Sequence, residues 1–376
     1  MAFGSSLPTS TVKPLVMNHK NRGTLRLALE EGGPGVCTFA INNACNARCG
    51  FCNFALDKLP REDWVYVPRK GAIDALNILH GQGIRYLVIT GGEPTMHPEL
   101  GAIVQHGSDL GMKVMLVTNG GLLRPERVRD WVTAGVSSFI ISIDAATVES
   151  HEGNRGLPGV CEKIRDANRL LKELKVHTTA SVTMSRLVDY EALPDFLKSL
   201  GFTSVTFSYP LRQLGSSFLG YSDSQLVEFT NGELDEAFER IKRLKKRFLV
   251  LNPTPSLEEM QRFVRQEPQR FPCLGGFQYF HLDWHLMLWR CHFWEKPMCS
   301  IYEFDGSQRV RDGCTRCMID CYRDASVMQY IGVSAHDTYQ AIRAGKLGQA
   351  AKALIRPANL GSLRAILEEL PWLMRF

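Results

Sequence analysis

Six short apolar runs, separated by segments of helical periodicity, constrain the fold of this 376-residue chain more than any other feature. The runs occupy residues 37–42, 85–90, 113–118, 138–143, 176–182 and 204–209. Five of them are dense in β-branched or aromatic residues and are bounded by Gly, Asn or Pro, as is typical of buried parallel strands. Helical periodicity fills the segments 68–81, 97–110, 124–134, 159–174 and 190–200. Six β-α units joined by right-handed crossovers predict an α/β fold whose parallel sheet curls into a partial (β/α)6 barrel of the TIM type.

The barrel pattern leaves stretches on both sides, so we expect four regions in the chain. They are an N-terminal leader over 1–36 that packs on the main domain, a barrel core over 37–250, a cysteine-rich extension over 251–333 and a basic helical tail over 334–376. Further elements are expected as helices at about 223–247 and 256–267 and as a β-hairpin at 277–290.

Charge and hydropathy favour a cytoplasmic protein. The formal net charge of +5 attracts anionic partners only weakly, and we expect no nucleic-acid partner. The N-terminus lacks the charged-then-apolar pattern of a secretory signal, and no apolar run approaches the roughly 18–20 residues of a membrane span. Eleven cysteines in a reducing compartment argue against disulfides. Cys37 and Cys161 stand apart from the others and are expected to be small buried hydrophobic residues.

Cys45, Cys49 and Cys52 form a CxxxCxxC loop close behind the first predicted strand. Protein thiolates are the usual ligands of a [4Fe–4S] cluster, and three of them leave one iron without a protein ligand. A small molecule could bind there and accept an electron, so the spacing indicates a reactive cluster. The alternative is zinc, but a structural zinc site takes four ligands, usually as two well separated pairs, and no histidine lies nearby.

Other distinctive residues follow the later strands at the same end. They are Gly91, Gly92 and Glu93 after the second strand, Asn119 after the third, and Ser142 and Asp144 at the end of the fourth. In barrels of this type the chemistry takes place at the C-terminal ends of the strands. We therefore expect these residues and the cysteine loop to form one site.

With Phe51 just before the last cysteine and G-G-E-P after the second strand, residues 37–210 resemble the radical S-adenosylmethionine (SAM) superfamily. The resemblance implies that Cys45, Cys49 and Cys52 ligate a [4Fe–4S] cluster, and that SAM chelates the fourth iron through its amino and carboxylate groups. It also implies that one electron cleaves the sulfonium and yields a 5′-deoxyadenosyl radical, which attacks the substrate. An electron donor such as flavodoxin or ferredoxin is then an expected partner.

The resemblance gives roles to the motifs at the strand ends. The carbonyls of Gly91 and Gly92, with the Glu93 carboxylate, suit the SAM ammonium group, which is only a donor. Ser142 and Asp144 suit the ribose hydroxyls. For Asp144, the N-cap of a helix is the alternative.

Arg155, in the H-E-G-N-R-G segment, is the candidate partner of the SAM carboxylate, because a guanidinium matches a carboxylate in bidentate geometry. A surface arginine is the alternative. Asn119 is expected to line the pocket, and Phe207 and Tyr209 are expected to bound the adenine side.

A second group of cysteines lies in the extension. Its members are Cys273, Cys291, Cys299, Cys314, Cys317 and Cys321. Their order resembles the auxiliary-cluster extension (twitch, a shortened SPASM domain) of several radical SAM enzymes, which implies that Cys273, Cys291, Cys314 and Cys317 ligate a second [4Fe–4S] cluster. Cys321 could replace Cys314 or Cys273 as a ligand, and Cys299 is not expected to be one. A zinc knuckle is the alternative.

The sequence therefore predicts a radical SAM enzyme that abstracts hydrogen from, or adds the adenosyl radical to, a small-molecule or lipid substrate. The run C-T-R-C-M-I-D-C resembles a segment of the adenosyl-hopene transferases, whose substrate is a polycyclic lipid. The basic tail could lie on a membrane surface, or could instead be a helix that caps the barrel. Two other functions stay open: a maturase that modifies a ribosomally made peptide, and a non-catalytic iron–sulfur or zinc redox protein.

Overall fold

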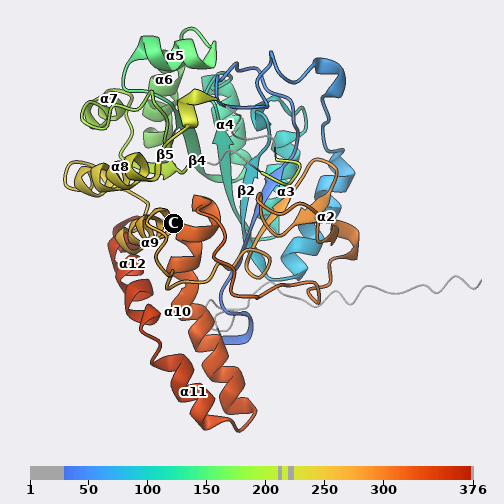
Figure 1. Ribbon diagram of the computed structural model, residues 1–376. Helices are drawn as coiled ribbons and strands as arrows, with labels where there is room; N and C mark the ends of the chain where they lie inside the picture. Colours follow the sequence, from blue (N-terminus) through green and yellow to red (C-terminus); the bar gives the residue numbers. More distant parts are fainter. Residues whose placement is uncertain (1–28, 211–213, 219–223, 374–376) are drawn as a thin grey trace, which may run out of the picture.

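The computed structural model describes residues 29–210, 214–218 and 224–373, and its centre is a curled sheet with helices packed around it (Figure 1). In this part of the chain the sheet has ten strands, in the order β10-β9-β8-β1-β2-β3-β4-β5-β6-β7. Most of the predicted leader, residues 1–28, lies outside the described residues.

Strands β1 to β6 are parallel and lie side by side in sequence order. Their bounds are β1 Gly35–Ala40, β2 Ile84–Thr90, β3 Lys113–Thr118, β4 Val136–Ile143, β5 His177–Thr183 and β6 Ser204–Ser208. In β4, Phe139 and Ile141 are fully buried, whereas Ile140 and Ser142 on the opposite face are partly exposed. Apolar side chains on one face of the sheet thus pack under the helices, and the predicted partial barrel is confirmed.

Helices follow the strands as the sequence predicts. Their bounds are α2 Arg69–Gly81, α3 Leu100–Asp109, α4 Pro125–Ala134, α6 Val160–Glu173 and α7 Leu193–Ser199. One more helix, α5 Val148–Arg155, was not predicted. The Thr147 hydroxyl accepts a hydrogen bond from the backbone N–H of Ser150 and caps its start, and Gly156 ends it in the left-handed conformation.

Two short strands extend the parallel sheet at its edges. Strand β7, Leu249–Val250, pairs with β6, and β8, Tyr279–Leu282, pairs in parallel with β1. Strand β8 also forms an antiparallel hairpin with β9, Met287–Trp289, which in turn pairs with β10, Cys299–Ser300. The predicted hairpin is therefore present, but it belongs to the same sheet as the barrel.

The C-terminal helices depart from the predicted bounds. Helix α8 spans Asn231–Leu244 and is shorter than predicted, because Thr230 and Glu233 form a capping box that fixes its start. Helix α9 spans Thr254–Val264. Helix α10, Asp320–Arg343, runs without a break through the expected boundary between residues 333 and 334. The remaining elements are α11 Leu347–Leu354, α12 Ala358–Leu373 and the 3-10 turns η1 Arg61–Asp63, η2 Pro94–Met96, η3 Gln225–Val227 and η4 Ile301–Glu303. In Figure 1, α10 and α11 extend below the barrel.

Candidate functional site

The cysteine loop follows β1 at the C-terminal end of the barrel strands. Cys45 and Cys49 are buried and Cys52 is partly exposed. The Lys58 ammonium donates hydrogen bonds to the carbonyls of Gly50 and Cys52, at 3.0 and 3.1 Å. These bonds close the loop on itself, so the three thiols lie in a folded segment.

Gly91 and Gly92 bring the end of β2 against this loop. The backbone N–H of Gly92 donates to the Asn42 carbonyl at 3.0 Å, and that of Glu93 donates to the Ala44 carbonyl at 2.7 Å. A Cβ atom added to Gly91 would lie 2.4 Å from the backbone oxygen of Asn42, and one added to Gly92 would lie 2.3 Å from the backbone oxygen of Ala44. The two glycines therefore allow the backbone of residues 42–44 to approach the end of β2 closely. From the sequence, we expected a bound ligand to take that place.

The Glu93 carboxylate joins the ends of β2 and β3. It is buried and accepts hydrogen bonds from the Thr95 N–H and hydroxyl, from the Thr118 hydroxyl at 2.8 Å and from the Asn119 N–H at 2.6 Å. Burial raises the pKa of Glu93, and these bonds oppose the rise. Its oxygens thus already have protein donors, and binding of the SAM ammonium by Glu93 stays a prediction.

Asn119 connects the end of β3 to the cysteine loop. Its side-chain amide donates to Asn46 Oδ1 at 2.8 Å and lies 3.8 Å from the Cys45 sulfur. The side chain is buried. The structure therefore brings Asn119 to the predicted site, beside the first cysteine.

Asp144, after β4, holds two residues of α5. Its Oδ1 accepts from Arg155 Nη2 at 2.7 Å, and its Oδ2 accepts from the Asn154 amide at 2.8 Å. The backbone N–H of Asp144 donates to His151 Nδ1 at 3.1 Å. The N-cap of α5 is Thr147, so the alternative reading of Asp144 as a helix cap is wrong.

Helix α5 in turn docks on the cysteine loop. The Arg48 N–H donates to the Arg155 carbonyl at 2.7 Å, and the Gly50 N–H donates to Asn154 Oδ1 at 3.2 Å. Asn154 and His151 were missed by the sequence analysis, although both lie in the H-E-G-N-R-G segment that indicated Arg155. The segment acts as a helix whose last turn positions Arg155.

Arg155 places a buried positive charge beside the three thiols. Burial acts to lower the pKa of its guanidinium, but Asp144 and the nearby Cys49 and Cys45 outweigh that effect and raise it. Burial also raises the pKa of the thiols, that of Cys45 to about 12. The alternative reading of Arg155 as a surface residue is wrong, since the residue is 6% exposed.

Unpaired buried polar atoms test whether a polar ligand fits beside the cysteine loop. Arg155 Nε, His151 Nε2 and Asn42 Oδ1 are buried without a hydrogen-bond partner in the described part of the chain. Buried polar groups are normally paired, so these atoms suit a polar ligand. No three His, Cys, Asp or Glu side chains among the described residues lie close enough to hold a single metal ion.

The remaining predicted residues divide into two sets. Phe51 is buried within the cysteine loop, and Ser142 is partly exposed on the face of β4 opposite the helices. Tyr209, by contrast, packs edge-on against Phe238 of α8 and donates to Asp324 of α10, and Phe207 lies against Tyr190. Phe207 and Tyr209 thus belong to the layer under the helices, and the expectation that they bound the adenine side was wrong. The alternation of side chains along β6 defines two faces of the strand but does not show which of them lines the barrel.

The second cysteine group is also brought together. Cys273, Cys291 and Cys317 are buried in one hydrophobic cluster, against which Cys314 packs. The Cys273 N–H donates to the Cys314 carbonyl at 2.8 Å. Burial raises the pKa of Cys291 to about 12 and that of Cys317 to about 11.

Two cysteines of the extension lie outside this cluster. Cys321 is exposed, near enough to Cys291 and Cys317 for their charges to interact. Cys299 lies in β10, where Glu303 and Asp305 are the nearest charged groups that affect it. The exclusion of Cys299 from the ligand set stays a prediction.

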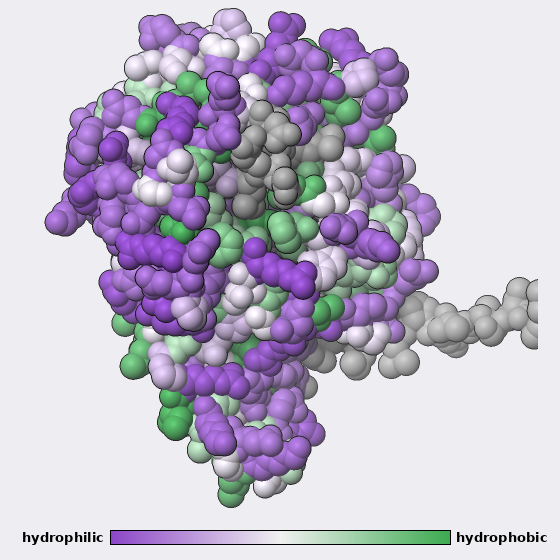
Figure 2. Space-filling view, in the orientation of Figure 1, coloured by the Kyte–Doolittle hydropathy of each residue, from purple (hydrophilic) through white to green (hydrophobic). Residues whose placement is uncertain are grey.

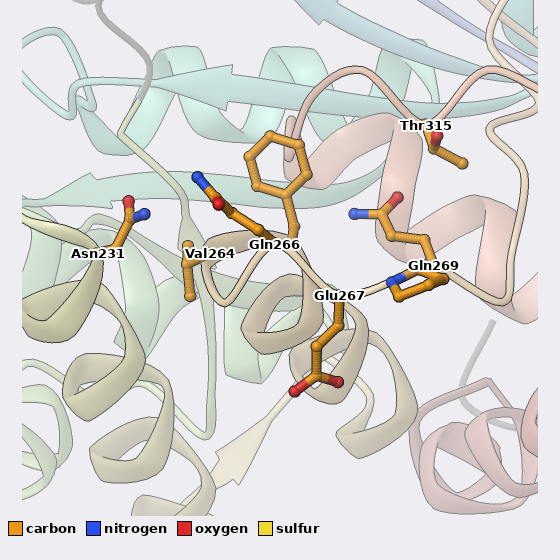
Figure 3. Close-up of a pocket in the computed structure, with 8 residues that line it drawn as sticks. Asn231, Val264, Gln266, Glu267, Gln269 and Thr315 are labelled. Atoms are coloured by element: carbon orange, nitrogen blue, oxygen red, sulfur yellow. The ribbon is translucent and has the colours of Figure 1, made fainter.

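A cleft of about 510 Å³ lies elsewhere, between the end of α9 and the segment around Thr315 (Figure 3). Gln266, Glu267 and Gln269 line one part of it, and Asn231 of α8 lies at another. It contains none of the residues that form the site at the cysteine loop.

Known proteins resemble this chain over its barrel. Residues 39–205 match the family model of the Radical SAM superfamily. An AdoMet-dependent heme synthase of Methanosarcina barkeri is 32% identical over 153 residues, which cover 39% of this chain and 43% of the relative. A PqqA peptide cyclase of Rhodopseudomonas palustris is 26% identical over 45% of this chain and 46% of the relative. The alignments thus span less than half of either relative. A crystal structure of Streptococcus suis SuiB has a TM-score of 0.55 at 13% identity, covering 77% of this chain and 68% of that one, and supports the fold alone.

Proposed function

Because this chain carries a Radical SAM superfamily domain in residues 39–205, we propose that it reductively cleaves SAM to a 5′-deoxyadenosyl radical. The radical would serve for hydrogen abstraction or adenosyl addition on a small-molecule or lipid substrate. The superfamily's cofactors, a [4Fe–4S] cluster and SAM, supply the radical when bound. The chain's own share is to hold, orient and shield them.

One observation carries this proposal: three thiols and a buried arginine converge at the strand ends. Cys45, Cys49 and Cys52 would hold the cluster, and its assembly would displace their protons. Arg155 would offset the negative charge of the thiolates. Asn119 would donate a hydrogen bond toward the Cys45 sulfur, where its amide already lies 3.8 Å away.

The same geometry supports roles in SAM binding. Arg155 Nη2 is bound to Asp144 while Nε lacks a partner, so Nε would be the donor for the SAM carboxylate. Asp144 would then act mainly by positioning Arg155. Ser142 lies two residues before it on the barrel-lining face and would contact the ribose.

Two observations bear on the substrate class: the names of the relatives and one cysteine run in the extension. The relatives include a heme synthase and a peptide cyclase, so their names do not agree on one substrate. A peptide substrate draws support from the peptide cyclase, and the lipid alternative from the C-T-R-C-M-I-D-C run. A non-catalytic redox protein fits less well, because these relatives are enzymes.

Anaerobic reconstitution followed by incubation with SAM and dithionite tests the core of the proposal. We expect release of 5′-deoxyadenosine by the wild type and none by Cys45→Ala, Cys49→Ala or Cys52→Ala. Cys161→Ala is the matched control, because Cys161 is an equally buried thiol on α6. The proposal fails if the wild type binds iron but releases no 5′-deoxyadenosine, or if the loop variants match the control.

Iron content tests the second cluster separately. Two [4Fe–4S] clusters require about eight iron atoms per chain. We expect Cys314→Ala or Cys317→Ala to lower this to about four and to spare some SAM cleavage. Cys299→Ala should retain the full content, and a wild-type content of about four would refute the auxiliary cluster.

A further inference from the structure

The helices at the C-terminus carry most of the exposed apolar side chains. Eight of the eleven large hydrophobic residues exposed in the described part of the chain lie between residues 342 and 370. They are Ile342, Leu347, Leu354, Ile355, Leu360, Leu363, Leu367 and Leu370. Such a concentration marks an interaction surface, whereas scattered exposed residues would need no explanation.

Helix α12 turns its leucines away from the protein. Leu360, Leu363, Leu367 and Leu370 follow each other at intervals of three or four residues and are 40–74% exposed. This spacing forms one stripe along a helix, which in a globular protein normally faces the core. The stripe of α12 therefore has no partner within the described chain.

The inner face of α12 is small and polar. Ser362, Ala365 and Glu369 are buried. The Ser362 hydroxyl donates to the Met328 carbonyl of α10 at 3.0 Å and accepts from the Ile331 N–H at 3.1 Å. These bonds fix the rotation of α12, so the outward position of the leucines is a property of the fold.

Helix α11 extends the apolar surface. Ala350 and Ala353 are buried, whereas Leu347 and Leu354 are 70% and 64% exposed and Ile355 beyond the helix end is 75% exposed. In Figure 2, green apolar residues lie along the lower left margin, where Figure 1 shows α11 and α12. We call the exposed side chains of residues 342–370 the α11–α12 face.

Charge distinguishes this face from an ordinary hydrophobic contact. Arg343, Lys346, Lys352 and Arg364 are exposed on it. The segment has only two acidic residues: Glu369 is buried, and the partly exposed Glu368 binds Lys245, the Thr254 N–H and Arg364. Outside the segment, Glu258 of α9 pairs with Arg364. The α11–α12 face is thus apolar with a net positive rim.

We infer that the α11–α12 face binds the surface of an anionic lipid membrane. An interfacial helix buries an apolar stripe among the lipid chains while flanking Lys and Arg attract anionic head groups. A second copy of this chain would present the same positive charges and would be repelled. No helix in the described residues is long and apolar enough to cross a bilayer, which leaves binding along the surface.

Vesicle flotation with the reconstituted full-length protein tests this inference. We expect binding to phosphatidylcholine vesicles that contain phosphatidylglycerol, and much weaker binding to phosphatidylcholine alone. Leu360→Ser/Leu367→Ser should lower binding at least tenfold, and Lys346→Gln/Lys352→Gln should lower it by roughly fivefold per charge removed. Val148→Ser/Tyr302→Ser removes exposed apolar side chains elsewhere and should bind as the wild type does.

Two results would overturn the inference. One is vesicle binding that is as strong without phosphatidylglycerol as with it, or that is as strong in the leucine variant as in the wild type. The other is a wild-type protein that does not bind vesicles and is a dimer by analytical ultracentrifugation, while the leucine variant is a monomer. The face would then join two copies of the chain. Neither readout requires SAM cleavage, so the outcome is independent of the proposed function.

Discussion

Arg155 Nη2 lies 2.7 Å from Asp144 Oδ1, in an ion pair whose side chains are 7% and 1% exposed. The pair links the end of β4 to the last turn of α5, which is itself bonded to the cysteine loop through Arg48. The pair is thus a positioning device for the positive charge beside the thiols.

Replacing Asp144 by Ala should strongly destabilise the protein. The change leaves a buried guanidinium without its partner, which costs about 3–5 kcal/mol in comparable proteins. The free energy of unfolding in urea measures the effect. Lys70→Ala, which removes an exposed pair with Asp74, is the control and should change stability little. Equal losses in the two variants would contradict the assigned role of the buried pair.

Gly92→Ala should disturb the cysteine loop. A Cβ atom at this position would lie 2.3 Å from the Ala44 oxygen, and backbone cannot move aside as the end of a flexible side chain can. We expect lower iron content after reconstitution and a loss of several-fold or more in 5′-deoxyadenosine release. Gly101→Ala on α3, where nothing lies within 4 Å, should instead stabilise the protein by about 0.5–1 kcal/mol. Normal iron loading of Gly92→Ala would show that the loop tolerates the shift.

Glu93→Gln tests the link between β2 and β3. A carboxylate accepts through both oxygens, but the amide of Gln would turn one donor toward the N–H of Asn119 or toward Thr95 and Thr118. Leaving a buried donor unsatisfied costs about 1–3 kcal/mol, and urea unfolding should detect that loss. Glu99→Gln, at an exposed pair with Arg69, should change stability little. If the two variants unfold alike, Glu93 does not hold the strands together.

The sequence predicted strongly periodic elements well and the faces of those elements poorly. All six core strands and five of their helices lie within a few residues of their predicted ranges, because burial under a helix layer leaves a clear apolar pattern. Helix α5 contains Gly153 and shows little apolar periodicity, so no helical pattern indicated it in the sequence. Tyr209 and Phe207 were placed on the wrong face because alternation gives two faces without naming them.

In the site, too, the sequence predicted which residues meet but not how their side chains are paired. The cysteine loop, Asn119, Asp144 and Arg155 converge as expected, since parallel strands bring their C-terminal ends to one edge. The sequence could not show that Asp144 already binds Arg155, because that contact depends on the rotation of α5. The continuity of α10 was likewise hidden, as no glycine or proline marks the true helix start near Asp320.

Two neighbouring glutamates of α12, Glu368 and Glu369, should affect the pH dependence of stability in opposite directions. Burial raises the pKa of Glu369 to about 7 from an ordinary value of 4.5, with Glu368 and Asp324 adding to the rise and Lys245 opposing it. Neither carboxylate oxygen of Glu369 has a hydrogen-bond partner in the described residues. An acid whose folded pKa is raised costs nothing at low pH, where it is protonated in both states. Its cost appears as pH rises from about 4.5 to about 7, because the folded state must then carry a buried charge.

Glu369→Gln should therefore raise the free energy of unfolding above pH 7, by at most about 3 kcal/mol. It should also flatten the pH profile of stability between about pH 4.5 and pH 7. Glu368→Gln should have the opposite effect. Burial acts to raise the pKa of Glu368, but the Thr254 N–H and Lys245 outweigh burial and lower it. Its ionised form stabilises the fold above its unfolded pKa, and this contribution is lost as pH falls. Urea unfolding of both variants from pH 4 to pH 8 measures the two profiles, and parallel profiles would contradict the opposite environments of the two side chains.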